Sequence, residues 1–392
     1  MGAPLEGLKV LELARILAGP WAGQTLADLG ADVIKVESPA GDDTRTWGPP
    51  FLTGADGEPS DAAYYHACNR GKRSITADFT TAEGQALVRR LAQDADILIE
   101  NFKVGGLVKY GLDYDSLKAV NPRLIYCSIT GFGQDGPYAH RAGYDFMIQG
   151  TGGLMDLTGD RDGEPQKVGV AIADIFTGVY GVIGILAALR RRDMTGEGEH
   201  VDMALLDTQV AVLANQAENY FISGKAPRRL GNAHPNIVPY QVFPSSDGHL
   251  IIACGNDGQF QRLCGILGCP QFATDPAYAT NAGRVAGRDV LVPQLAELTA
   301  RFTRDDLLAA LETAGVPAGP INTVADVFED PQVLHRQLKV DLPATHVSAG
   351  SVPSVRTPIR FRNAELSLKT AAPGLGEHTA SVLAEIGWEK GE

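Results

Sequence analysis

The sequence predicts an α/β protein with a large Rossmann-like domain over residues 1–224 and a smaller α+β domain over residues 225–330. Three observations support this division. Strand-like apolar runs alternate with helix patterns through the first half, as a parallel sheet requires. The loop-like stretch "SGKAPRRLGNAHPN" then marks a change of composition. With 392 residues, the chain is also long enough for two domains.

The large domain is expected to begin with a βαβ unit. "LKVLEL" is a short strand, "GPWAGQTLADLG" is a helix closed by Gly30, and "ADVIKVE" is the next strand. The threonine-capped helix "TTAEGQALVRRLAQDA" precedes the buried strand "DILIEN", and "YDSLKAVNP" with "RLIYCSITGFG" repeats the alternation. The first βα turn, "LARILAGPWAG", lacks the G-x-G-x-x-G fingerprint, which argues against a nicotinamide or flavin dinucleotide.

A glycine-rich loop, "GTGGLMDLTGDRDGEP", leads into the apolar helix pattern "VGVAIADIFTGVYGVIGILAAL". A second long helix is expected over "HVDMALLDTQVAVLANQAENYFI". In the smaller domain "HLIIACG" is a strand, whereas "DGQFQRLCGILG" and "TRDDLLAALETAG" are helices. The final segment, 331–392, contains the strand-like stretch "PIRFRNAEL" and ends in the short helix "HTASVLAEIGW".

The composition narrows the class of protein. A net charge of −13 argues against nucleic acid and anionic membrane surfaces as general partners. The longest apolar run, within 179–189, is shorter than a membrane span, and the N-terminus lacks a signal peptide, so a soluble cytoplasmic protein is expected. Five scattered cysteines without a CxxC pair indicate reduced thiols. His66 lies two residues before Cys68 without a second ligand pair, so no metal site is predicted.

Asp174 is the one carboxylate at the start of the apolar helix over 168–189. It could cap the helix by accepting a hydrogen bond from a backbone N–H. It could also be a nucleophile toward an activated acyl group, because the positive helix end would hold its pKa low and keep it ionised. The two roles are compatible, and the residues alone leave both open.

Cationic side chains are the other candidates for a binding site. Arg70, Lys72 and Arg73 in "CNRGKRS" form the densest cluster and could bind phosphate or carboxylate. Arg45 and Arg141 are weaker candidates, since single cations are usually solvated surface charges. A loop histidine in "GNAHPN" is a further candidate, while the acidic pairs in "DADI" and "GDDT" lack metal-ligand spacing.

Taken together, these stretches resemble the class III coenzyme A-transferases over nearly the whole chain. The matching motifs are "VLELARILAGPWAGQTLADLGADVIKVE", "GDDTRTWGPP", "NRGKRSI", "IENF", "YCSITGFGQDGP", "AGYDFMIQG", "ADIFTGVYGVIGILAALRRRDMTGEGEHVDMALLD" and "GVPAGPIN". The resemblance implies a Rossmann-like large domain built from both termini, so that 331–392 returns to it, and an interlocked homodimer. It also implies that Asp174 is the nucleophile and forms an aspartyl anhydride and then an aspartyl-CoA thioester, with acyl-CoA as substrate and no bound metal or redox cofactor.

The resemblance also assigns binding residues. The positions that match its CoA-binding segments are Ile16, Leu17, Ala18, Ala77, Thr80, Asn101, Phe102, Lys109, Arg141 and Ala142. Ser38 departs from the arginine of formyl-CoA transferases, and "GNAHPNIVPYQ" replaces their glycine-rich tetrad, which disfavours oxalate as acceptor. The similarity is greatest to members that transfer CoA from succinyl-CoA to glutarate. Arg70 is then the leading candidate for the distal carboxylate of a dicarboxylic acid, with Tyr144, Asn232 and His234 as further substrate contacts.

Two alternatives share this fold. One is a 2-methylacyl-CoA racemase, which uses a histidine where this chain has Tyr144, a much weaker base at neutral pH. The other is transfer to a different acceptor, such as malate, oxalate or a carnitine-type acid.

Overall fold

The computed structural model describes residues 2–388, which divide into two compact units. Unit 1 contains residues 2–154, 168–217 and 331–388, and unit 2 contains residues 155–167 and 218–330. Residues 155–167 and 218–224, which the sequence assigned to the large domain, therefore belong to unit 2. The expected division at residues 225 and 331 into functional domains stays a prediction.

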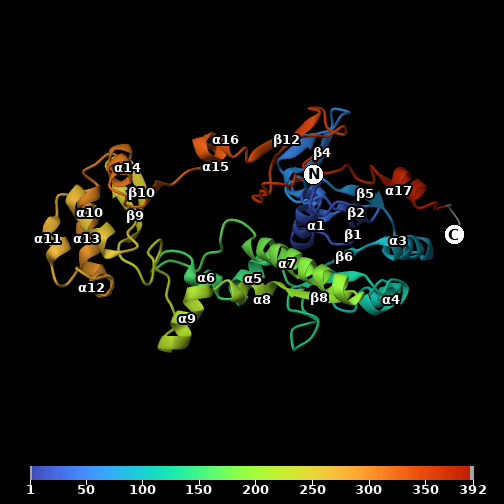
Figure 1. Cartoon of the computed structure of the whole chain (residues 1–392), viewed down its shortest axis with the longest axis horizontal. Helices are drawn as coiled ribbons and strands as arrows, with labels where there is room; N and C mark the ends of the chain where they lie inside the picture. Colours follow the sequence, from blue (N-terminus) through green and yellow to red (C-terminus); the bar gives the residue numbers. More distant parts are fainter. Residues whose placement is uncertain (1, 389–392) are drawn as a thin grey trace. The chain divides into compact units, whose positions relative to one another are not determined.

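Unit 1 is organised around a six-stranded sheet in which every paired neighbour is parallel (Figure 1). Its order is β5-β2-β1-β6-β7-β8, which is the doubly wound 3-2-1-4-5-6 order of Rossmann folds. The strands are β1 (Lys9–Glu12), β2 (Asp32–Glu37), β5 (Arg73–Thr76), β6 (Ile97–Glu100), β7 (Ile125–Thr130) and β8 (Glu199–Ala204). The predicted α/β fold with a central parallel sheet is confirmed.

Helices cover both faces of this sheet because its strands are apolar on both sides. On one face Val10 and Ile99 pack with α1 (Ala18–Asp28) and α7 (Ile172–Thr195). On the other, Leu11 and Leu98 pack with α3, α4 and α17. These three helices are α3 (Ala82–Asp94), α4 (Tyr114–Val120) and α17 (Thr379–Glu385), and the hydroxyl of Thr81 caps α3 as expected.

Smaller elements complete unit 1. They are β3 (Phe51–Thr53), β4 (Pro59–Ala62), α2 (Ala63–His66), α5 (Asp145–Thr151), α8 (Leu205–Ala211), α16 (Pro331–His335), β12 (Lys339–Pro343) and β13 (Ser351–Val355), with two 3₁₀ turns at Asp43–Thr46 and Val108–Tyr110. Two more helices, α6 (Leu154–Leu157) and α9 (Ala214–Ser223), begin in unit 1 and end in unit 2.

Unit 2 has its own apolar core, around Phe243, Leu250 and Leu263. Its antiparallel sheet, β11-β10-β9, pairs β9 (Tyr240–Ser245), β10 (Gly248–Ala253) and β11 (Ala318–Pro320). Its helices are α10 (Asp257–Ile266), α11 (Pro270–Thr274), α12 (Asn281–Ala286), α13 (Arg288–Thr299), α14 (Arg304–Thr313) and α15 (Val324–Glu329).

Two predicted elements are wrong. The long helix expected over 200–222 is a strand followed by two shorter helices, because "HVDMA" pairs in parallel with β7 and Val212–Leu213 separates α8 from α9. The strand expected in "PIRFRNAEL" is absent from the described residues 358–366.

α7 is longer than its apolar run suggested. Its 24 residues and mean hydropathy of 2.0 would suffice to cross a membrane by length and composition alone. However, Val182 and Ile185 pack against the sheet in the main core cluster, and 44% of the most apolar stretch of the helix is buried.

Candidate active site

A pocket with a volume of about 540 Å³ opens in unit 1 at the carboxyl ends of the parallel strands. Its walls include Arg15–Ala18, which follow β1, and Asn101–Val104, which follow β6. β1 and β6 are the neighbours at which the strand order reverses. Ligands of open α/β sheets bind at this switch point, so the topology predicts a ligand site here independently of any motif.

The pocket contains most of the residues that the sequence selected. Those lining it are Ile16, Leu17, Ala18, Thr80, Asn101, Phe102, Lys109, Arg141, Ala142, Tyr144 and Asp174. They come from widely separated parts of the sequence. Their individual roles in binding stay predictions.

The turn after β1 is held in an unusual conformation. Ile16 has a φ of 73°, in the left-handed region that β-branched residues rarely adopt. Its N–H points toward the Asp42 carboxylate, at 3.3 Å from both oxygens. Asn101, directly after β6, fixes the same turn, since its side chain accepts the Arg15 N–H at 2.9 Å and donates to the Arg15 carbonyl at 2.7 Å. Backbone strain of this kind is concentrated at functional sites.

Asp174 lies in the first turn of α7 and lines the pocket. The predicted capping role is wrong: the N-cap residue is Ala171, and Asp145 provides the cap instead. The Asp145 Oδ1 atom accepts the backbone N–H groups of Ala173 at 2.8 Å and Asp174 at 3.4 Å. Asp145 is itself held by Gln149, whose Nε2 donates to Oδ2 at 2.7 Å. Asp174 is therefore relieved of a structural hydrogen bond at the helix start.

The predicted lowering of the Asp174 pKa is also wrong. Burial, and then the charge of Asp145, raise the pKa of Asp174 to about 7. Burial is the larger cause, and Asp145 adds to it because its carboxylate already occupies the positive helix end that was expected to stabilise the Asp174 charge. Among the described residues, none donates a hydrogen bond to the Asp174 carboxylate. A poorly solvated carboxylate is more nucleophilic than a fully hydrated one, provided that it is deprotonated.

Two cations of the pocket wall were missed by sequence reasoning. Arg15 pairs with Asp43 at 2.9 Å and lies 5.7 Å from the centre of the Phe102 ring. Lys103 is exposed on the loop after β6. Their position in the sequence could have identified them, because both residues follow strands whose carboxyl ends meet at the switch point.

An aromatic group and two further cations complete the pocket wall. Phe79 packs edge-to-face against both Phe102 and Tyr110, with ring centroids 5.6 Å apart in each pair. Arg141 stacks over Tyr138 at 3.8 Å, and Lys109 lies 4.7 Å from the centre of the Tyr110 ring. Such a wall offers flat apolar surface and positive charge together, which suits a ligand with an aromatic base and phosphate groups.

The basic cluster "NRGKRS" is not part of this pocket. Arg70, the leading candidate for a distal carboxylate, is buried and makes two hydrogen bonds to Asp28. Lys72 is fully buried against Glu12, at 2.8 Å, and Arg73 pairs with Asp32 and Glu385. The prediction that this cluster binds phosphate or carboxylate groups of a ligand is therefore wrong. Each of the three cations is already paired with a carboxylate from another segment of the chain.

Ala77 does not line the pocket either. Its side chain is 6% exposed and belongs to the apolar core beneath α3. The predicted direct contact with CoA at this position is therefore not supported by its placement.

Asn232 and His234 belong to unit 2. The His234 Nδ1 atom accepts the Asn236 N–H at 3.0 Å, and its backbone carbonyl accepts from Arg288 at 2.6 Å. Burial, and then the charge of Arg288, lower the pKa of His234, which favours the neutral imidazole. The role of Asn232 and His234 as substrate contacts stays a prediction.

Known proteins resemble this chain over most of its length. The profile described as "CoA-transferase family III" matches residues 5–379. The chain is 61% identical to the "Succinate--glutarate CoA-transferase" of Agrobacterium fabrum, over 98% of this chain and 96% of that protein. It is 42% identical to the human "Succinyl-CoA:glutarate CoA-transferase", over 98% of this chain and 86% of that protein. A crystal structure of a CAIB/BAIF family protein from Brucella suis is 65% identical, with a TM-score of 0.88, covering 98% of this chain and 100% of that chain.

Proposed function

This chain belongs to CoA-transferase family III and is a CoA-transferase, and we propose that it transfers CoA from succinyl-CoA to glutarate with Asp174 as the covalent nucleophile. The choice of acids is supported by the activity for which the Agrobacterium fabrum relative is named, since that protein is 61% identical over nearly the full length of both chains. One structural observation carries the role of Asp174: its carboxylate lines the switch-point pocket while the neighbouring Asp145 caps the helix.

The reaction balances without redox chemistry. An Asp174 oxygen attacks the succinyl thioester carbon, the C–S bond breaks, and CoA leaves as a thiolate. The thiolate attacks the aspartyl carbonyl of the resulting anhydride, which releases succinate and forms an aspartyl-CoA thioester. Glutarate attacks this thioester to give a second anhydride and the thiolate, which then attacks the glutaryl carbon. Glutaryl-CoA forms and the Asp174 carboxylate is regenerated.

The pocket walls are suited to two requirements of these reaction steps. The free thiolate must stay beside the anhydride, since positioning two reactants can replace a bimolecular encounter. We propose that cations lining the pocket keep the thiolate in place by binding the CoA phosphates. These cations are Arg15, Lys103, Lys109 and Arg141. The aromatic residues beside them can pack against adenine. Water must also be excluded from the anhydride, which is consistent with the burial that raises the pKa of Asp174.

The enzyme is further proposed to act as a cytoplasmic homodimer. Phe176, Val179, Tyr180 and Ile183 are each exposed by 39–55% and recur along one face of α7 at helical spacing. A contiguous exposed apolar stripe on an otherwise core helix favours coverage by another chain. Light scattering during size exclusion would test this, and a monomer at micromolar concentration would contradict it.

The proposed chemistry can be tested by trapping. Wild-type enzyme is incubated with succinyl-CoA alone, treated with hydroxylamine or borohydride, and digested for mass spectrometry. A mass change is expected on the peptide that contains Asp174, and it should be absent in Asp174→Ala. Glutarate added before trapping should yield glutaryl-CoA and lower the trapped fraction. An unmodified Asp174 peptide after incubation of active enzyme with succinyl-CoA alone would refute Asp174 as the nucleophile, whereas trapping without glutaryl-CoA formation on addition of glutarate would refute only the acceptor.

A further inference from the structure

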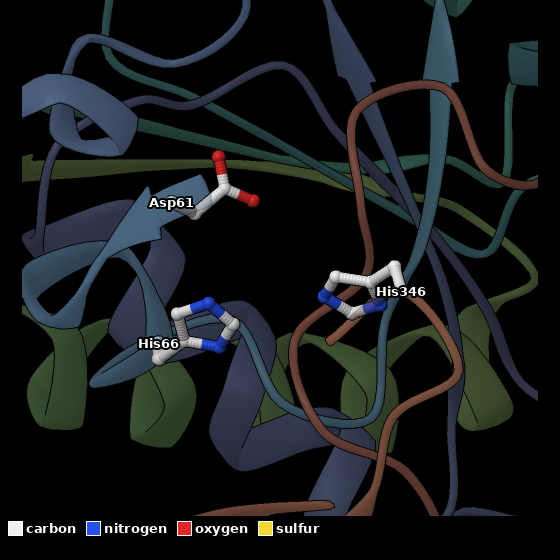
Figure 2. A group of neighbouring side chains, drawn as sticks. All are labelled: Asp61, His66 and His346. Carbon is white, nitrogen blue, oxygen red and sulfur yellow. The ribbon is translucent and has the colours of Figure 1, made fainter. Parts of the chain in front are cut away.

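Three side chains of unit 1 converge in Figure 2, and none of them lines the switch-point pocket proposed to bind CoA. Asp61 comes from β4, His66 from the end of α2, and His346 from the loop between β12 and β13. One potential ligand atom of each lies within 4.8 Å of those of the other two. The two imidazole rings are nearly parallel, with an interplanar angle of 11° and centroids 6.2 Å apart.

The hydrogen bonding of this group is incomplete. His66 is only 7% exposed, and within the described part of the chain neither of its ring nitrogens has a hydrogen-bond partner. The buried ring nitrogens of His346 also lack one, although Nδ1 lies 3.5 Å from a Glu377 carboxylate oxygen. Buried polar atoms without partners are rare in native structures and call for an explanation such as an ion.

We propose that Asp61, His66 and His346 bind a Zn²⁺ ion. Two imidazoles and one carboxylate form a ligand set that zinc uses in proteins, with a fourth position left for water or another oxygen. All three side chains point toward a common space in Figure 2. The site lies outside the CoA pocket and goes beyond the transfer reaction, which does not depend on it.

The surrounding contacts support the carboxylate in this role. Arg45 Nη1 donates to Asp61 Oδ2 at 2.5 Å, which fixes the carboxylate and leaves its other oxygen for an ion. The positive charge of Arg45 is itself balanced, since its guanidinium makes a bidentate pair with Glu37 at 2.6 and 2.8 Å. Ligating carboxylates in metalloproteins are commonly held by such an outer hydrogen bond.

Zinc binding requires the three ligand atoms to move slightly closer together. Ligands on one tetrahedral zinc lie roughly 3.3 Å apart, given bond lengths of about 2.0–2.1 Å, so the most distant pair would close by up to about 1.5 Å. His346 is the residue that can move, because its side chain is partly exposed and it lies in a loop. That loop is already joined to the β3–β4 hairpin, where Ala55 N–H donates to the His346 carbonyl and Ser348 N–H to the Thr53 carbonyl.

A bound ion would therefore have a structural consequence. Unit 1 is assembled from separate stretches of chain, and residues 331–388 rejoin it after unit 2. Zinc at this position would cross-link that returning segment to residues 51–66. The returning segment would be stabilised against local opening, as expected when a ligand binds only the folded state.

The test is zinc titration of the full-length protein after dialysis against a chelator. Binding is measured by competition with a chromophoric zinc indicator, and Co²⁺ absorption reports the ligand geometry. One zinc per chain is expected for the wild type. His66→Ala and His346→Ala should each weaken binding by at least about 100-fold, more than the loss typical of outer-shell changes. The exposed His335→Ala is the matched control and should bind as the wild type does.

Thermal unfolding with and without Zn²⁺ gives a second readout. The wild type and His335→Ala should gain thermal stability with zinc, whereas His346→Ala should not. Substoichiometric or absent binding by the wild type would overturn the proposal without any variant. Equal zinc affinity in His346→Ala and the wild type would overturn it as well. Neither result would affect the trapping of an acyl group on Asp174.

Discussion

The pH dependence of transfer should be governed by the pair of carboxylates at the start of α7. Asp174 must be deprotonated to attack, so kcat/KM should fall as the pH decreases through the pKa of about 7 in the free enzyme. Asp145→Asn removes the neighbouring negative charge and keeps an oxygen that can accept the Ala173 and Asp174 N–H groups. The substitution thereby separates the charge of Asp145 from its cap on the helix, with loss of the hydrogen bond from Gln149 Nε2, which an amide NH2 group cannot accept.

The structure sets the size of the expected change. Burial is the larger cause of the raised Asp174 pKa and Asp145 the smaller, so the charge of Asp145 accounts for less than half of the rise from 3.8 to about 7. The acid limb of kcat/KM should then move to lower pH by up to about 1.5 pH units in Asp145→Asn. At pH 6 the ionised fraction of Asp174 would increase from about a tenth to as much as about three quarters.

The assay is the initial rate of glutaryl-CoA formation at limiting succinyl-CoA between pH 5 and 8, about 2 pH units below to 1 above that midpoint. Asp341→Asn, an exposed carboxylate in β12, serves as the control and should leave the profile unchanged. Asp145→Ala should show a similar shift but lose about 1 kcal/mol of stability with the cap. An acid limb that stays near pH 7 in Asp145→Asn, or moves upward, would refute this account of the site.

Three further substitutions test separate parts of the structure. Asp174→Asn should lower the transfer rate by at least about 10⁴-fold with the fold retained, measured by kcat and circular dichroism, because an amide cannot form the anhydride. Lys109→Ala should raise KM for succinyl-CoA by up to about 5-fold with little change in kcat, whereas Lys118→Ala, outside the pocket, should not. Gly178→Ala should destabilise the protein by about 1–3 kcal/mol in urea unfolding, because a Cβ there would lie 2.7 Å from the carbonyl of α1 residue Ala18. Gly265→Ala, with open space around the added atom, should be neutral or stabilising.

The sequence predicted the elements whose signals are local. The strands β1, β2, β6 and β7 are short apolar runs next to helix patterns, so the α/β class could be read directly from the sequence. "HVDMA" was assigned to a helix because its apolar residues continue into the helical pattern of α8. Its pairing with β7 depends on a strand about 70 residues earlier in the chain, which the local pattern does not report.

Partners that are distant in sequence account for the errors at the site. Arg70 looked like a free cation, but its partner Asp28 lies on α1. Asp174 looked like a cap, but the capping carboxylate comes from α5, 29 residues earlier. In both cases the residue type was informative and the assigned interaction was wrong. The pKa of Asp174 was mispredicted for the same reason, because burial and the charge of Asp145 raise it, whereas its place at the helix end was expected to lower it.

The same reasoning explains why a metal site could escape a search for ligand spacing. His66 has a cysteine two residues later, which suggested a local motif that is incomplete, whereas the side chains it meets in space are Asp61 and His346. His346 lies in the segment that rejoins unit 1 after unit 2, so only the fold brings it to α2. α2 also contains Tyr64, where burial and then the charge of Asp174 raise the pKa of the phenol to about 12. One short helix thus contains both a candidate zinc ligand, His66, and a residue that is influenced by the charge of the nucleophile, Tyr64.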